Sequence, residues 1–176
     1  MFSLETQAVK ITAVNPRTEI HGDEHVPAAD ISITFDAAND LLIDFAPTLR
    51  TMLFAKANKT SGVPQQGELD AVEPASDMPA LRDIGLEPPF KVKFEGAGYS
   101  VEIIVGITGD QNIDLDDAKV GKIRITPKEG GTVTFAMQIQ ASGLDEAVLG
   151  RLCTLIGSEV RMALTPPVAD QERIAA

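Results

Sequence analysis

Apolar and polar side chains alternate along several segments of the chain, a period of two that is typical of half-buried β-strands. The clearest segment is 29–37, ADISITFDA, where the apolar positions run from Ile31 to Phe35 and polar residues stand between them. A looser alternation at 8–14 predicts an earlier strand, and the Asn15-Pro16 pair that follows it predicts a turn.

The second half of the chain continues this alternation, and glycines separate its segments. The GAG tripeptide at 96–98 predicts a hairpin turn, and Gly130-Gly131 supplies the positive φ that a second hairpin turn needs. The strands predicted in this half are 90–95, 99–107, the two sides of the hairpin within 119–142, and 158–165. This half is therefore β-rich.

Helical spacing replaces the alternation in two places. At 39–57 apolar residues recur three and four positions apart, and Asp44 is the expected N-cap. At 142–157 a capping-box pattern begins at Ser142, and Gly157 suits the end of a helix. Strands and helices together predict the α+β class. We expect a mostly antiparallel sheet of about seven or eight strands, arranged as a sandwich or partly open barrel, with two covering helices.

The length of 176 residues predicts one domain, which we place at 1–165. The segment 58–79 has no periodicity, many turn-forming residues and several acids, so it is expected to be a flexible acidic loop. Residues 166–176 are expected to form a frayed tail.

Charge and cysteine content limit the partners and the compartment. The formal net charge is −11, which repels phosphate and argues against duplex DNA or an anionic membrane as a partner. No stretch approaches the roughly 20 apolar residues that span a bilayer, and the N-terminus is unlike a secretory signal. The single cysteine, Cys153, lies in the second helix, where a structural thiol is expected. A cytoplasmic location is predicted.

The stretch EIHGDEHVP at 19–27 contains both histidines and matches the H-x-x-E-H pattern of some zinc peptidases. That chemistry needs a helix to bring the two imidazoles onto one face, but Gly22 and Pro27 oppose a helix and both flanks are strands. We predict an extended connection. Its four polar residues could form a weak metal site or a pH-sensitive contact: His21, Asp23, Glu24 and His25.

Other chemistries lack their usual residues. The segment 110–117 begins like a calcium loop, but Leu115 and Gly121 stand where that loop needs glycine and glutamate, so a solvated connection between strands is expected. The chain has no phosphate-binding glycine loop, no dinucleotide fingerprint and no nucleophile elbow. No catalytic residue, resident metal or cofactor is predicted.

Basic residues of the second half gather on its predicted hairpins. A basic sheet face with an aromatic platform can bind single-stranded DNA, whereas the simpler interpretation is a solvated outer face that protects strand edges. The residues of this candidate face are Lys91, Lys93, Tyr99, Lys119, Lys122, Arg124 and Lys128.

Several motifs resemble a group of small acidic bacteriophage and prophage proteins. They are VNPRTEIHGDE, DISITF, FAPTLRTMLF, ITPKEGGTVTF and LGRLCTLIGSEV, within 8–164. The resemblance implies a phage-encoded cytoplasmic protein acting inside the bacterial host, and it assigns no functional residues.

The leading hypothesis is non-enzymatic protein–protein binding to a host or phage partner, including inhibition of a nucleic-acid-processing system. The alternatives are a single-stranded-DNA-binding accessory protein on an oligonucleotide-binding-type barrel and, less favoured, a hydrolase that uses 21–25. Exposed sheet edges make a homo-oligomer a further expectation.

Overall fold

The computed structural model describes residues 2–56, 76–106 and 111–167 of the chain. The strands are β1 (Leu4–His21), β2 (Glu24–Ala38), β3 (Phe54–Ala55), β4 (Ala80–Leu81), β5 (Phe90–Lys91), β6 (Gly96–Ile104), β7 (Ile113–Pro127), β8 (Thr132–Ser142) and β9 (Glu159–Thr165). The helical segments are the 3-10 helix η1 (Asn39–Asp44) and the α-helices α1 (Leu49–Leu53) and α2 (Glu146–Thr154).

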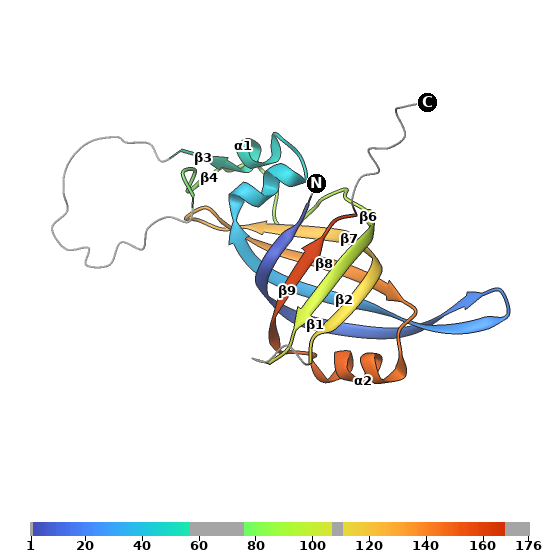
Figure 1. The fold of residues 1–176 in the computed structure, drawn as a ribbon. Helices are drawn as coiled ribbons and strands as arrows, with labels where there is room; N and C mark the ends of the chain where they lie inside the picture. The colour runs from blue at the N-terminus through green and yellow to red at the C-terminus, as the bar shows by residue number, and fades with distance from the viewer. Residues whose placement is uncertain (1, 57–75, 107–110, 168–176) are drawn as a thin grey trace, which may run out of the picture.

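Six strands form a closed antiparallel barrel in the order β1-β2-β8-β7-β6-β9, and β9 pairs again with β1 (Figure 1). The barrel closes because β7 pairs with β6 along one edge and with β8 along the other. The short β5 pairs with the same edge of β7 as β6 does, so it continues the line of β6. The predicted antiparallel β-rich class is confirmed. The barrel is closed rather than partly open, and no sandwich forms in the described residues.

The predicted alternation places the core inside the barrel. Ile31, Ile33 and Phe35 of β2 are at most 5% exposed, and the polar residues between them point outward. Phe35 is paired in register with Phe135 of β8, and their rings stack with centroids 5.3 Å apart. Aromatic and aliphatic side chains thus fill the interior, and apolar burial stabilises the barrel.

The turn predicted at Asn15-Pro16 is wrong, because β1 continues through both residues to His21. Beyond Lys10, β1 has no further register partner in β9, and a proline on such an edge costs no ladder hydrogen bond. A bulge after Ile11 also shifts the alternation. Hence Val14, and not Ala13, continues the buried row of Val9 and Ile11.

The single helix predicted over 39–57 is also wrong. The structure has η1, a turn, the short α1 and then strand β3. Pro47 lies in the interruption, and proline both lacks an N–H and clashes with the preceding helical turn. Asp44 therefore ends η1 and does not cap a helix.

The hairpin turn at Gly130-Gly131 is confirmed, with φ of 85° and 83°, and β9 appears where a final strand was expected. The turn predicted at 96–98 is wrong, because these residues lie within β6. Gly96 is needed there for space: a Cβ would lie 2.5 Å from Cε2 of Tyr99.

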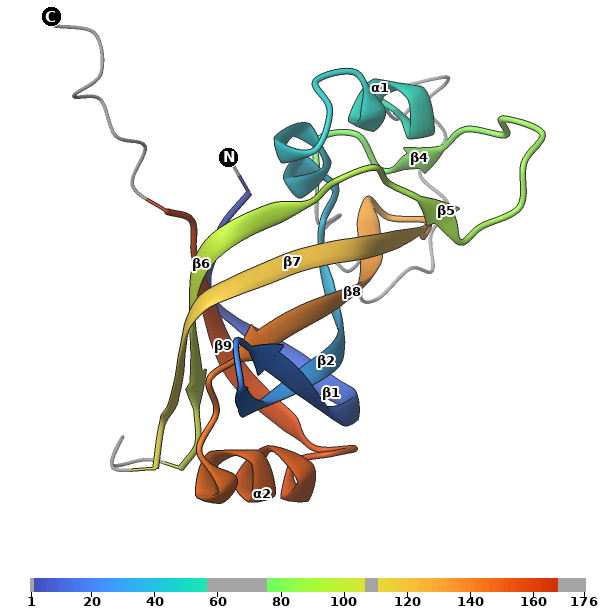
Figure 2. The ribbon, with the colours of Figure 1, turned by 90° about the vertical axis from the view of Figure 1, so that its right-hand side faces the viewer.

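The two ends of the barrel are covered by different helical segments, as Figure 2 shows. α2 covers one end through Leu152, which is fully buried, and η1 and α1 lie at the other. α2 is shorter than the predicted 142–157. Ser142 ends β8 and the N-cap, Asp145, makes no side-chain cap hydrogen bond, so the capping box is wrong.

A buried polar network joins η1 to α1 and to the segment that precedes β4. Asn39 accepts hydrogen bonds from Ser76 Oγ at 2.6 Å and Arg50 Nε at 3.0 Å, and it donates to the Met78 carbonyl at 2.9 Å. Ser76 and Met78 are each 9% exposed. Residues 76–79, the last of the segment predicted as a flexible loop, therefore include two that pack and hydrogen-bond against η1.

Residues 57–75 of that loop region and 168–176 of the predicted tail lie outside the described residues. In the described part of the chain, no helix is long and apolar enough to cross a membrane.

Candidate functional site

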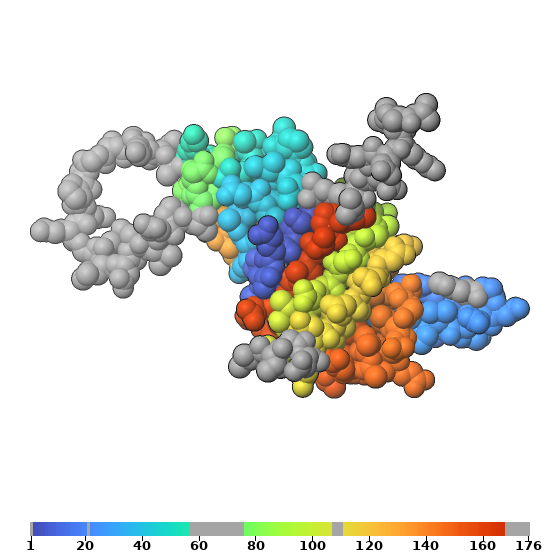
Figure 3. All heavy atoms as spheres, viewed as in Figure 1, coloured from blue at the N-terminus to red at the C-terminus, as the bar shows by residue number. Residues whose placement is uncertain are grey.

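The hairpin formed by β1 and β2 extends beyond the barrel (Figures 1 and 3). The β2–β8 ladder ends at Ala28↔Ser142 and the β1–β9 ladder ends at Lys10↔Glu159. The β1–β2 ladder continues to His21↔Glu24. We call residues 17–27 the arm. In the described structure its strands pair with each other, and at the base the Leu144 N–H also donates to the Pro27 carbonyl at 3.0 Å.

One face of the arm continues the core-facing surface of the sheet. Residues opposite one another in an antiparallel ladder share a face, and the pairs here are Ile20↔His25, Thr18↔Pro27 and Pro16↔Ala29. Because side chains alternate along a strand, this is also the face of Ile31. Inside the barrel Ala29 and Ile31 are 0% exposed, whereas Ile20 on the arm is 69% exposed. The arm thus presents to solvent a surface that the barrel elsewhere buries.

The opposite face of the arm carries an ionic network at its base. Arg17 Nε donates to Asp30 Oδ1 at 2.9 Å, and Arg17 also pairs with Glu19. Burial lowers the pKa of Arg17, but the hydrogen bonds to Glu19 and Asp30 outweigh it and raise that pKa above its usual value. These contacts link the β1 strand of the arm to the part of β2 inside the barrel, and they lie on the face opposite Ile20.

The outer edges of the arm are poorly suited to pairing with another strand. Pro27 in the arm and Pro16 just before it lack the N–H that a ladder needs, and the tip carries exposed Asp23 and Glu24. Proline and charge are common protections of edge strands against aggregation. A partner would therefore contact the arm through its side chains rather than by adding a strand.

The histidine motif lies at the tip of this arm. Residue 21 ends β1, residues 22 and 23 form the turn, and residue 24 begins β2, so the predicted extended backbone is confirmed. His25, Asp23 and Glu24 are exposed, while the side chain of His21 lies outside the described structure. Among the described residues, no group of three or more His, Cys, Asp or Glu is placed to hold a metal. The single helical turn that the peptidase pattern requires is not formed.

Two other candidates also fall on ordinary structure. Asp114 lies in the ladder of β7, whereas a calcium loop would need it in a loop. Asp110, the first residue of the calcium-loop pattern, lies outside the described residues. Cys153 is half-buried in α2 and packs against the core, which agrees with a structural thiol.

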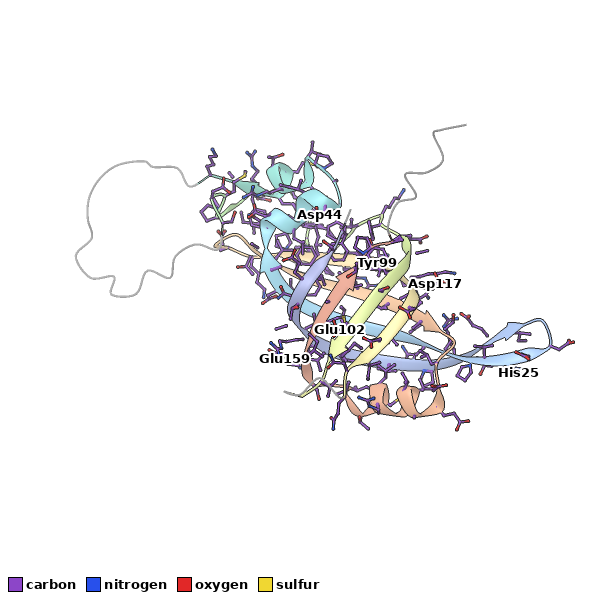
Figure 4. The ribbon with its side chains drawn as sticks, viewed as in Figure 1. His25, Asp44, Tyr99, Glu102, Asp117 and Glu159 are labelled. Carbon is purple, nitrogen blue, oxygen red and sulfur yellow. The ribbon has the colours of Figure 1, made fainter. Side chains whose placement is uncertain are left out.

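The seven residues of the candidate nucleic-acid face fall into three environments. Tyr99 is 0% exposed and its hydroxyl donates to the Phe2 carbonyl at 3.1 Å, so its predicted place on an outer face is wrong. Figure 4 shows Tyr99 within the barrel region, distant from His25 on the arm. Burial, and secondarily the charge of Asp44, raises the pKa of Tyr99. Lys128 is engaged with Asp36, Nζ to Oδ2 at 3.0 Å.

The remaining five cations line two adjoining grooves on the outside of the barrel, with volumes of about 370 and 670 Å³. These cations are Lys91, Lys93, Lys119, Lys122 and Arg124. Glu95 and Lys122 line both grooves, which makes the two continuous. We call this surface the basic groove. The sequence predicted its charges but not its shape, which arises where the β5–β6 line is interrupted beside a bulge in β7.

Compared with known proteins, the chain matches no protein-family model, no curated protein and no solved structure.

Proposed function

We propose that this protein is a non-enzymatic binding protein of phage type that docks onto a protein partner through the arm. The observation that carries the proposal is the exposure of Ile20 on a sheet face that is otherwise core-facing. A single exposed apolar residue is common on protein surfaces, but Ile20 stands on a projecting hairpin in line with the core-facing row, where contiguous apolar surface marks interaction sites. The arm has no core of its own, and an isolated two-stranded hairpin is only marginally stable in water, so its extension favours a role outside the barrel.

The partner's chemistry follows from the arm. Ile20, Thr18 and Pro27 would fit an apolar depression. Asp23 and Glu24 at the tip, with the chain's net charge of −11, favour a basic rim around that depression. In the setting that we propose, the partner is a host or phage protein, and docking inhibits or redirects a nucleic-acid-processing system inside the bacterial cell.

Affinity capture with matched variants tests this function. Ile20→Asp places a charge on the apolar face, and Leu86→Asp is the control because Leu86 is similarly exposed, at 68%, in the connection between β4 and β5. We expect a protein that is retained from infected or lysogenic host lysate by the wild type and by Leu86→Asp but lost with Ile20→Asp. Identical retention by all three chains would remove the arm from the function.

A second copy of the chain is the other partner that this geometry allows. Sedimentation of the purified protein over a range of concentrations distinguishes it. Self-association that Ile20→Asp abolishes and Leu86→Asp preserves would identify the partner as the chain itself, and a monomer at all concentrations would leave a different protein.

A further inference from the structure

The basic groove concentrates positive charge on an acidic molecule. The chain has 15 basic and 26 acidic residues, yet the residues that line the groove include five cations and only one carboxylate, Glu95. Within the described residues, none of these five cations forms an ion pair, whereas Arg17, Arg50 and Lys128 each do. Unpaired cations held close together raise the local potential and favour a polyanion.

The groove exists because two irregularities face each other. β7 bulges between Gly121 and Arg124, where Lys122 adopts a φ of 53°, and the backbone between β5 and β6 leaves the regular ladder. Gly96 and Gly121 contribute no side chain to the groove. A Cβ at Gly96 would collide with the buried Tyr99 ring, so this opening is fixed by the core beneath it.

An unsatisfied hydrogen-bond acceptor lies in the same place. Gln138 of β8 lines the groove opposite Gly121, and its Oε1 is buried with no hydrogen-bond partner in the described structure. Buried polar atoms are nearly always satisfied, so this acceptor beside the cations is a place where a water or the donor group of a ligand would bind. An acidic peptide offers only backbone N–H groups as donors, because its carboxylates are acceptors, whereas nucleobases carry amino and imino donors on exposed edges.

We infer that the basic groove binds a single strand of nucleic acid, with phosphates on the cations and a base edge donating to Gln138. A single strand fits better than a duplex because the donors on its Watson–Crick edges are unpaired. Stacking contributes little. Phe94, the one aromatic residue among those lining the groove, is half-buried with its ring edge-on to Phe45 at 5.4 Å between centroids. Binding therefore rests on phosphate contacts and falls steeply with salt.

Fluorescence anisotropy of a labelled oligodeoxycytidine, measured across salt concentrations with the full chain, tests this inference. Five phosphate contacts give a slope of log K against log salt of about −3.5 for a single strand. We expect Lys122→Ala to reduce the steepness by about 0.7, and Lys128→Ala, whose amine is engaged with Asp36, to leave it unchanged. Gln138→Leu weakens binding at each salt concentration without changing the slope.

Three outcomes would overturn the inference. The first is no binding at the lowest salt concentration, and the second is the same slope for Lys122→Ala and Lys128→Ala. The third is displacement of the probe by polyglutamate or by an equal length of duplex as readily as by unlabelled single strand. Ile20→Asp must bind the probe like the wild type. The inference and the proposed function can therefore fail separately.

Discussion

The side chains of Asn39 and Ser76 hydrogen-bond at 2.6 Å although they are 37 positions apart in the sequence. Their contact is the centre of the polar network that also includes Arg50 and the Met78 carbonyl. Asn39 is 0% exposed, so solvent water does not reach its side chain, and Arg50 Nη2 also donates to Ser76 Oγ at 2.8 Å. The network fixes the far end of the barrel to the segment before β4.

Replacing Asn39 with alanine should destabilise the fold strongly. The change leaves the Met78 carbonyl without its partner and removes one hydrogen bond each from Ser76 and Arg50, which keep their bond to each other. An unsatisfied buried group and the lost hydrogen bonds together cost about 3 kcal/mol. Urea denaturation measures the loss in the free energy of unfolding. Asp40→Asn is the control, because Asp40 pairs with Arg50 from an exposed position and should cost less than about 1 kcal/mol. Equal costs for the two variants would contradict the importance of the network.

Gly130 and Gly131 form a matched pair for separating backbone strain from packing. Both have φ near 85°, but a Cβ at Gly130 meets nothing within 4 Å, whereas one at Gly131 would lie 2.7 Å from Ser76 Cβ. We expect Gly130→Ala to lower the free energy of unfolding by about 1 kcal/mol. Gly131→Ala should lower it by about 3 kcal/mol, since overpacking is added. Thermal or urea unfolding of both variants measures the two losses in free energy of unfolding. Equal losses would show that Ser76 is not packed against the turn.

Tyr99 is the single tyrosine, and the chain has no tryptophan, so its ionisation can be followed alone by ultraviolet absorbance. Burial raises its pKa above the usual value of 10.0, and the charge of Asp44 adds to the effect. A raised pKa means that the neutral phenol stabilises the fold below pH 10 and that this contribution is lost as pH rises through the folded-state pKa. Tyrosinate should appear at higher pH in the native protein than in urea. Titration at the same pH in both would contradict the burial of Tyr99.

Asp36 should stabilise the fold at neutral pH and lose that effect in acid. The Thr134 hydroxyl at 2.5 Å and, more weakly, Lys128 lower its pKa below 3.8, although partial burial acts in the other direction. A depressed pKa gives stability above pH 3.8 that disappears as pH falls through the folded-state value. Asp36→Asn should therefore cost up to about 1 kcal/mol at pH 7 and progressively less below pH 3.8. A cost that does not change with pH would contradict the ionic contact.

Much of the barrel could be predicted from local pattern. The alternation in β2 and β8 and the glycines between β7 and β8 act over neighbouring residues, where sequence is informative. Barrel closure could not be predicted, because it depends on pairings between strands that are distant in the sequence, β2 with β8, β1 with β9 and β6 with β9. The turns predicted at Pro16 and Gly96 are wrong for a related reason. A proline on an edge and a glycine over an aromatic ring are set by tertiary neighbours.

The two candidate surfaces could be predicted to different degrees. The clustering of charge along the sequence indicates the lysines of the basic groove. The alternation around Tyr99 does not say which of its two faces points inward, and in the structure the Tyr99 ring is buried in the core. In the sequence, the arm is marked only by its two histidines, whose pattern resembles a metal site and does not indicate a projecting hairpin. Its apolar face rests on Ile20, whose exposure follows from where the β2–β8 ladder ends. No local pattern shows that end.

Photo-cross-linking inside the host cell tests the docking role of the arm most directly. A photoreactive amino acid at position 20 lies on the exposed apolar face, and one at position 86 is an equally exposed control away from the arm. The account predicts a discrete cross-linked protein from position 20 that is missing from position 86. No discrete product from position 20, or the same product from both positions, would contradict it.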